Sequence, residues 1–415
     1  MYQAPRGTSD ILPEDQPYWR FIENVISEVT KIYGYRRIDT PVFEDTGLFN
    51  RSVGQGTDIV EKEMYTFEDK GGNSITLRPE GTAPVCRAYL EHGMQNLPQP
   101  VKMYYQAPIF RYERPQAGRL REHHQFGCEC VGDADPAADA EVIEMAWRFY
   151  NSLGIKNLSL QLNSIGDRLC RPAYLNILKE YYTSQSEKLC ADCKTRLAKN
   201  PLRLLDCKQP SCQAIADAAP ASADHLCPEC QAHFNSLQKY LKSLNIPYSI
   251  NHRLVRGLDY YTRTVFEFQP EEEKGQSSIG AGGRYDNLIE ELGGKPTSAI
   301  GFGIGIERVV LNLKKQNISV PAVPQPKIIV ATLGDAARDA GVKLASDLRR
   351  AGISAVTSAG GKSLKAQLRQ ADALGARYAV IIGEDEVKAG TVTLRDMTNA
   401  SQETLAVQEL AARIL

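Results

Sequence analysis

A proline-rich break near residue 320 constrains this chain more than any other feature of its sequence. Residues 320–326 read VPAVPQP, with three prolines in a short run. Because proline fixes φ and lacks an amide hydrogen, such a run cannot lie inside a helix or a central strand. We therefore expect a semi-rigid linker at residues 321–326 between a large domain, residues 1–320, and a small one, residues 327–415.

The segment after the linker alternates between apolar strands and helical periodicity. Residues 327–333 form a short apolar run, and Ala340, Leu344 and Leu348 then recur every four residues. Further strand and helix patterns follow in turn. This alternation predicts a small α/β domain with a largely parallel sheet.

The pattern of residues 1–320 is different. Several strands are separated by turns or long loops with few crossover helices, which favours an antiparallel sheet with helices packed around it. Residues 167–250 are mostly helical in pattern and rich in cysteine, so we interpret them as an insertion carried by the larger domain. The whole chain is thus predicted to have an α+β fold.

Composition excludes several classes of protein. The chain has 49 Lys+Arg and 50 Asp+Glu, so its overall charge predicts no nucleic-acid partner unless a local patch provides one. No run of 18 apolar residues is present, which argues against a transmembrane helix, and the polar, proline-broken start is not expected to be a signal peptide. Ten cysteines are too few for a disulfide scaffold, and we expect a reducing cytoplasm.

The stretch from residue 101 to residue 130 holds the most informative polar pattern. Residues 109–113 alternate, so a strand there would place Arg111 and Glu113 on one face. An arginine-rich loop follows, and then residues 125–129 alternate as a second strand with polar residues on one face. A single ion pair on a strand would be the ordinary interpretation. Two polar faces joined by an arginine-rich hairpin favour a binding site instead.

Two glycine-containing segments add to this candidate site. Residues 255–261 read VRGLDYY and combine a cation, a carboxylate and two phenols. Residues 298–308 read SAIGFGIGIER, with glycines at every second position, so one strand face carries no side chains and a ligand can lie against the backbone. The spacing does not fit a dinucleotide-binding turn. The GGKS at residues 360–363 fails as a phosphate loop because Val356 stands where its first glycine should be.

These segments resemble known motifs. Three of them resemble the signature motifs of class II aminoacyl-tRNA synthetases: residues 36–44, 110–114 and 301–308. Further segments resemble the histidyl-tRNA synthetase family: residues 6–10, 78–82, 114–119, 254–261 and 282–286. The resemblance extends over essentially the whole chain. It implies ATP-dependent ligation of L-histidine to tRNA(His) through a histidyl-adenylate, with release of pyrophosphate and AMP, by a class II catalytic domain and a C-terminal anticodon-binding domain.

The resemblance also implies roles for individual residues. Arg111 and Arg256 would be catalytic, holding the α-phosphate of ATP from two sides, where phosphoryl transfer needs cations and positioning. The residues implied to bind histidine are Glu80, Gly81, Thr82, Arg111, Gln125, Glu129, Arg256, Tyr260, Tyr261 and Tyr285. Those implied to bind ATP, which enters with Mg²⁺, are Arg111, Glu113, Arg119, His123 and Arg308, with His123 at a loop position where the family commonly stacks a phenylalanine on adenine. Arg114 and Gln116 would approach the tRNA acceptor end.

The resemblance implies partners as well. They are tRNA(His), L-histidine, ATP and a second copy of the chain, docked through residues 33–44. Residues 327–415 carry 12 Lys+Arg and 10 Asp+Glu, too balanced for charge alone to predict RNA binding. Two other classes remain as alternatives: a non-catalytic regulatory subunit of an ATP phosphoribosyltransferase, and an RNA-binding module without catalysis. The intact VRGLDYY segment and the complete C-terminal segment argue against the first, and the arginines of the candidate site argue against the second.

Six cysteines lie between residues 190 and 230. Cys190 and Cys193, and likewise Cys227 and Cys230, have the C-x2-C spacing of zinc ligands, and two more cysteines lie between the pairs. A structural zinc would fold the helical insertion. The other interpretation is reduced thiols in a helical domain that folds without metal, since the family does not in general need zinc. We assign no metal ligand from the sequence, and both interpretations remain open.

Overall fold

The computed structural model describes residues 2–54, 57, 59–115, 118–271, 278–358 and 360–414. The chain divides into two compact units, Met1–Pro321 and Ala322–Leu415, and each is described here by itself. Within the described residues, no helix combines the length and the apolar character that a membrane span needs.

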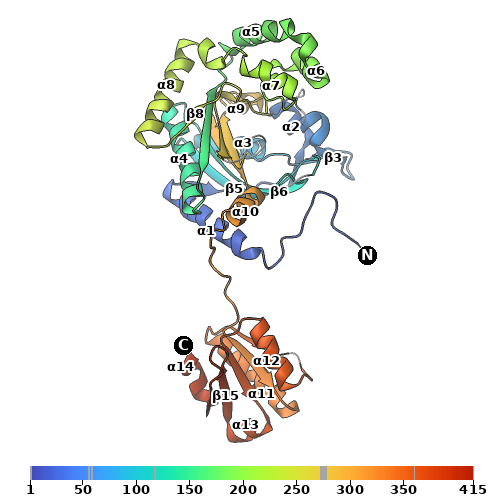
Figure 1. The fold of residues 1–415 in the computed structure, drawn as a ribbon, viewed down its shortest axis with the longest axis vertical. Helices are drawn as coiled ribbons and strands as arrows, with labels where there is room; N and C mark the ends of the chain where they lie inside the picture. Colours follow the sequence, from blue (N-terminus) through green and yellow to red (C-terminus); the bar gives the residue numbers. More distant parts are fainter. Residues whose placement is uncertain are drawn as a thin grey trace. The chain divides into compact units, whose positions relative to one another are not determined.

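The larger unit is built on an eight-stranded sheet of order β1-β5-β6-β11-β10-β9-β7-β8 (Figure 1). The strands are β1 Arg36–Arg37, β5 Val101–Phe110, β6 Glu122–Val131, β7 Leu158–Ser164, β8 Ser249–Ile250, β9 Thr262–Pro270, β10 Gly280–Arg284 and β11 Ala299–Gly305. Every pairing from β5 through β7 is antiparallel, and only the short edge strands β1 and β8 pair in parallel. The predicted antiparallel sheet is confirmed.

One face of this sheet is covered by four helices. They are α1 Gln16–Ile32, α4 Pro136–Ser152, α8 Pro228–Ser243 and α10 Ile306–Lys315. Because side chains alternate along a strand, Phe126 and Cys128 of β6 and Ile300 and Phe302 of β11 point into the core beneath these helices. Burial of this apolar face leaves the intervening residues of β6 and β11 on the opposite face.

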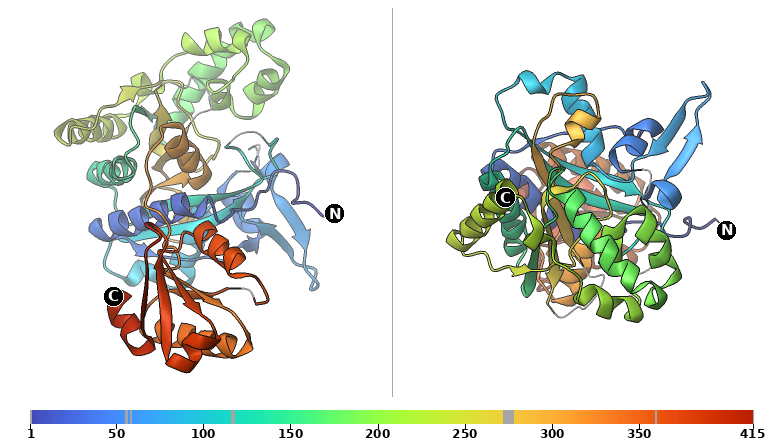
Figure 2. Two further views of the ribbon diagram at one scale, coloured as in Figure 1. Left: turned by 60° about the horizontal axis from the view of Figure 1, so that its bottom comes forward. Right: turned by 90° about the horizontal axis from the view of Figure 1, so that it is seen from above.

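The opposite face is bordered by smaller elements. A three-stranded antiparallel sheet of order β2-β4-β3 comprises β2 Phe43–Asp45, β4 Ser74–Leu77 and β3 Tyr65–Glu68. Near it lie α2 Thr46–Ser52, the π-helical turn η1 Ile59–Glu63, α3 Thr82–Glu91, η2 Met94–Asn96 and α9 Leu288–Glu291. The helical insertion contains α5 Arg171–Ser184, η3 Ser186–Lys188, α6 Ala191–Lys199, η4 Pro201–Leu204, α7 Pro210–Asp217 and η5 Ser222–His225, and it ends in α8. Figure 2 shows α5 to α7 gathered in one group.

The smaller unit is an α/β fold with a five-stranded sheet of order β13-β12-β14-β15-β16. Its strands are β12 Ile328–Thr332, β13 Ala355–Thr357, β14 Tyr378–Ile382, β15 Thr391–Asp396 and β16 Gln402–Ala406. Its helices are α11 Asp335–Arg350, α12 Leu364–Ala373, α13 Glu384–Ala389, η6 Val407–Glu409 and α14 Leu410–Ile414. The first three strands are parallel, as expected, but β15 and β16 add an antiparallel hairpin. Ser363 caps α12, in keeping with a turn at the GGKS segment.

The strand predicted at residues 109–113 is wrong at its end. β5 stops at Phe110, so Arg111 and Glu113 do not share a strand face. The amide of Arg111 still donates to the carbonyl of Arg121 (2.8 Å), but the amide of Glu113 donates back to the carbonyl of Arg111 (2.8 Å). This i to i+2 hydrogen bond turns the chain away from the sheet.

Candidate active site

A large cavity lies on the open face of the sheet. This outer cavity has a volume of about 910 Å³ and is lined by strands of the sheet, by the hairpin between β5 and β6, and by the helical insertion. A second, inner cavity of about 50 Å³ lies deeper. Both cavities are lined by Arg111, Gln125, Arg256, Ala281 and Gly303, so these residues mark the junction between them.

The bare glycine face of β11 accommodates polar side chains of β6. A Cβ atom at Gly301 would overlap the Glu129 carboxylate, and one at Gly303 would overlap the Gln125 amide. The sequence predicted that a ligand would lie against this bare face. In the structure, the Glu129 and Gln125 side chains lie beside Gly301 and Gly303, and both glycines also line the inner cavity.

Glu129 lies at the centre of the polar groups around the inner cavity. Its side chain is fully buried, and it accepts hydrogen bonds from Thr82 Oγ1 (2.8 Å) and from the hydroxyl of Tyr285 (2.5 Å). Burial raises the pKa of Glu129 to about 8, although the two hydroxyl donors lower it. The carboxyl group is therefore largely protonated at neutral pH in the absence of a ligand.

A second buried carboxylate, Glu80, is fixed by the start of α3. It accepts from the backbone amides of Thr82 (2.6 Å) and Ala83 (2.8 Å), and the hydroxyl of Tyr260 lies 3.4 Å away. These amides belong to the first turn of the helix, where they have no partner within the helix. Burial raises the pKa of Glu80 as well. Two carboxyl groups and several tyrosine hydroxyls thus surround a small enclosed space.

The variant Glu129→Gln tests the raised pKa of the Glu129 carboxyl group. Because the pKa of Glu129 is about 8 in the folded protein against an ordinary value of 4.5, the folded state retains a proton that the unfolded state releases. The free energy of unfolding of the wild type therefore falls as the pH rises between these two values. Glu129→Gln cannot ionise, so its stability relative to the wild type should increase across this range and level off above it.

Urea unfolding of the ligand-free proteins at a series of pH values measures this difference. A difference that stays constant over the range would show that Glu129 is already ionised in the folded protein.

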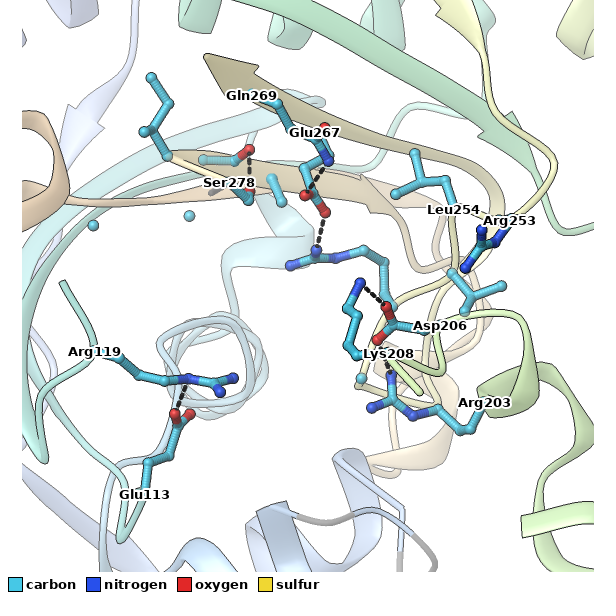
Figure 3. A pocket seen from close by; sticks show the side chains of 18 of the residues that line it. Glu113, Arg119, Arg203, Asp206, Lys208, Arg253, Leu254, Glu267, Gln269 and Ser278 are labelled. Atoms are coloured by element: carbon cyan, nitrogen blue, oxygen red, sulfur yellow. Dashed lines mark hydrogen bonds and ion pairs between the residues drawn. The ribbon is translucent and has the colours of Figure 1, made fainter. Parts of the chain in front are cut away.

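Arg111 and Arg256 are each held in place at the junction of the cavities. The Nε atom of Arg111 donates to the carbonyl of Pro79 (2.7 Å). Arg256 Nη1 donates to Glu267 Oε2 (2.9 Å), and the other oxygen of Glu267 accepts from Gln269 (2.7 Å; Figure 3). The Nε atom of Arg256 is buried and has no hydrogen-bond partner within the described part of the chain. Two fixed guanidinium groups are therefore available to one anionic group.

Other predicted residues line the outer cavity. Glu113 and Arg119 form an ion pair with each other, and Figure 3 shows them together on one side of the cavity. Arg308, in the first turn of α10, donates to the carbonyls of Gly118 (2.8 Å) and Ser278. The sequence therefore predicted correctly that Arg308 lies in the first turn of this helix.

The sequence predicted that His123 lies in the hairpin loop, but in the structure it lies on β6. β6 begins at Glu122, earlier than expected, because its pairing with β5 continues through His123 opposite Ile109. Burial, together with the nearby Arg111 and Arg308, lowers the pKa of His123 to about 3. The ring is thus neutral at physiological pH, and it lines the outer cavity.

Not every predicted residue lines a cavity. Gly81 precedes α3, where a Cβ atom would overlap the ring of Tyr105, and Glu129 lies behind the cavity wall. Arg114 is exposed. Gln116 lies outside the described residues. The remaining predicted residues line the outer or the inner cavity: Glu80, Thr82, Arg111, Glu113, Arg119, His123, Gln125, Arg256, Tyr260, Tyr261, Tyr285 and Arg308.

Sequence reasoning missed several lining residues. Tyr105 of β5 fills the space left by two glycines, Gly81 and Gly127, and its hydroxyl lies 3.3 Å from Gln125. Glu267 alternates with the buried Phe266 and Phe268 along β9, and this alternation could have placed it on the polar face. The insertion contributes three charged residues that no sequence pattern predicted, Arg203, Asp206 and Lys208, and Arg253 follows shortly after it (Figure 3).

Two family models match the chain. The one described as histidyl-tRNA synthetase matches residues 7–309, and the one described as an anticodon binding domain matches residues 327–415. A histidine--tRNA ligase of Dehalococcoides mccartyi is 63% identical over 414 residues, which cover 100% of this chain and 99% of that protein. One of Pelotomaculum thermopropionicum is 52% identical over 401 residues, covering 97% of this chain and 94% of that protein.

Solved structures agree with these matches. The structure of apo S. aureus histidyl-tRNA synthetase has a TM-score of 0.83 at 39% identity, and all of both chains is covered. A Bacillus halodurans protein described as an ATP phosphoribosyltransferase regulatory subunit/histidyl-tRNA synthetase has a TM-score of 0.66 at 22% identity, with 92% of this chain and 98% of that one covered. The latter likeness shows the fold alone. The resemblance inferred from the motifs is confirmed.

Proposed function

Because this chain belongs to the histidyl-tRNA synthetase family, it uses ATP to ligate histidine to tRNA(His), and we propose that the inner and outer cavities hold the substrates. The observation that carries this proposal is the position of Arg111 and Arg256. Both line the two cavities, so an amino acid in the inner cavity and ATP in the outer one would meet at these two cations. The first step joins the histidine carboxylate to the α-phosphate at such a junction.

The inner cavity suits an amino acid with several polar groups. An ammonium group needs acceptors, and a neutral imidazole needs one donor and one acceptor. Glu80, Thr82 and the tyrosine hydroxyls line the cavity and offer both kinds of partner, and Glu129 lies behind them, in contact with Thr82 and Tyr285. A bound cation would lower the pKa of Glu129 and displace its proton. An apolar analogue would leave these buried groups unpaired, a penalty that can reach about 10⁴-fold.

The two arginines act on the charge that develops during activation. A histidine carboxylate oxygen attacks the α-phosphorus, the bond to the pyrophosphate oxygen breaks, and negative charge gathers on the α-phosphate oxygens. Arg111, fixed by Pro79, and Arg256, fixed by Glu267, need little reorganisation to stabilise this charge. A terminal ribose hydroxyl of the tRNA then attacks the histidyl carbonyl, and AMP leaves.

The remaining groups of the outer cavity fit the rest of MgATP. Arg119 and Arg308 would contact the outer phosphates, since a guanidinium matches phosphate geometry. Glu113 would accept from the adenine amino group in place of its present ion pair with Arg119. The ring of His123 would stack on adenine. Because this ring is neutral, it would not repel the neighbouring arginines.

The tRNA would contact both units. Residues 327–415 would bind the anticodon, which the match to an anticodon binding domain supports. Arg114, in the hairpin that borders the outer cavity, and Gln116 would approach the acceptor end. We further propose that residues 1–320 form the catalytic domain, that residues 321–326 form the linker, that the chain acts in the cytoplasm, and that it forms a homodimer through residues 33–44, as the resemblance implies.

Pyrophosphate–ATP exchange with each of the twenty amino acids, without tRNA, tests this proposal. We expect exchange with histidine alone, because only histidine satisfies the buried polar groups of the inner cavity. Histidine binding without exchange would instead indicate a regulator that retains the synthetase fold.

A further inference from the structure

The cysteines of the helical insertion form two separate groups. Group A consists of Cys190, Cys193, Cys207 and Cys212, and group B consists of Asp167, Cys170, Cys227 and Cys230. The two C-x2-C pairs, which the sequence left as one ambiguous set, therefore lie in different groups. We propose that the insertion holds two structural zinc ions, one in each group.

Group A has the dimensions of a tetrathiolate zinc site. Its four sulfur atoms all lie within 4.8 Å of one another, and the Cys190 and Cys207 sulfurs are 3.9 Å apart. Four thiolates around zinc with Zn–S bonds of about 2.3 Å have sulfur–sulfur separations of about 3.8 Å. Small shifts of these side chains would complete a closed four-ligand shell, which structural zinc requires.

Backbone amides already point at the sulfurs of group A. Cys190 caps α6, and its sulfur accepts from the amide of Cys193 (3.4 Å). The amide of Cys190 in turn donates to the sulfur of Cys212 (3.3 Å). Hydrogen bonds of this kind orient ligands and stabilise thiolate charge around a metal. The helix N-terminus favours the same charge.

Group B has a mixed set of ligands, and its own geometry supports a site. Cys227 immediately precedes α8 and Cys230 lies in the first turn of that helix, while Asp167 and Cys170 lie just before α5. One carboxylate oxygen and three sulfurs lie within 4.8 Å of one another. Arg263 donates a hydrogen bond to Asp167 Oδ2 (3.3 Å). Such an outer partner fixes the orientation of a carboxylate that binds a metal.

The backbone of group B allows the Asp167 carboxylate and the Cys170 sulfur to lie close together. Gly166 has φ of +67°, and a Cβ atom there would lie 2.7 Å from the sulfur of Cys170. The amide of Asp167 donates to the same sulfur (3.5 Å). The backbone thus brings the carboxylate and the thiol of the D-x2-C segment together.

The metal would strengthen a part of the molecule that has short elements. α6 has 9 residues and α7 has 8 residues, and such helices are marginal without tertiary support. Metal binding supplies folding free energy directly. Group A also holds both ends of the segment that carries Arg203, Asp206 and Lys208 into the outer cavity. The zinc in group A would therefore fix one wall of that cavity.

Metal analysis of the full-length protein, purified without chelators, tests the proposal. We expect two zinc ions per chain in the wild type, one in Cys193→Ala, one in Cys230→Ala and none in the double variant. Cys86→Ala is the matched control, because Cys86 is a buried thiol outside both groups, and it should retain two. Less than one zinc per wild-type chain, or iron in its place, would overturn the proposal. If Cys230→Ala contains as much zinc per chain as the wild type, the group B site is overturned.

X-ray absorption at the zinc edge of the wild type needs no variant to fold. We expect Zn–S distances of about 2.3 Å. The measured coordination shell should be the average of two sites, one with the four sulfurs of group A and one with the three sulfurs and one oxygen of group B. A shell made only of nitrogen and oxygen would contradict the assignment. Neither measurement depends on histidine activation, so the outcome is independent of the proposed roles of the active-site residues.

Discussion

Arg256→Ala is expected to lower the rate of histidine-dependent pyrophosphate exchange by about 10³-fold. The guanidinium lines both cavities and is held by Glu267, so it stabilises charge on the α-phosphate as that charge develops. Its loss should reduce kcat much more than it raises the KM for histidine, because the interaction strengthens in the transition state. Initial exchange rates over a range of histidine and ATP concentrations separate these two effects.

Arg253→Ala is the matched control for this variant. Arg253 lines the same outer cavity, but it forms an ion pair with Asp217 (2.6 Å) and does not line the inner cavity. Its replacement should change kcat only a few-fold, since it removes a similar positive charge that does not lie at the junction. If the two variants lose activity equally, the effect belongs to the overall charge of the cavity and the role assigned to Arg256 is wrong.

Gly301→Ala is expected to have a large effect on histidine binding and on stability. The added Cβ atom would overlap the Glu129 carboxylate and the carbonyl of Cys128, which lies in the paired strand and cannot move freely. Overpacking of a buried site costs about 1–3 kcal/mol of the free energy of unfolding. Displacement of Glu129 from its hydroxyl donors should raise the KM for histidine by about 10- to 100-fold, the equivalent of one or two charged hydrogen bonds.

Gly305→Ala on the same strand is the control. A Cβ atom there would have Arg308 Cγ as its nearest neighbour at 3.9 Å, which is an ordinary contact. This variant should keep the KM for histidine of the wild type. Urea unfolding and histidine titration of exchange would be measured for both variants. Equal KM values for histidine in Gly301→Ala and the wild type would contradict the role assigned to the space beside Gly301.

Much of the active site could be predicted because strands impose a period of two on the sequence. Gln125, Gly127 and Glu129 fall on one face of β6, and the glycines of β11 fall on the face that meets them. The start of α10 and the position of Arg308 followed from local patterns in the same way. These features depend on neighbours in the sequence, so the sequence alone contains them.

The ends of the hairpin strands could not be predicted in this way. Cross-strand pairing extends β6 back through His123, although the polar residues there resemble a loop. Pairing also ends β5 at Phe110, where a tight turn moves Glu113 away from the face predicted for it. Hydrogen bonds between the two strands determine where each strand ends, and the alternation of residues along one strand does not reveal these bonds.

The sequence by itself determined the family, the antiparallel core, the polar strand faces and the arginines that suit ATP, because each rests on a contiguous motif or a short periodicity. Tertiary structure alone decided that Tyr105 fills the space between Gly81 and Gly127, and that Glu267 holds Arg256. It also divided the cysteines between group A and group B. The physical reason is that these contacts join residues from separate elements, and only the packing of those elements determines which side chains meet.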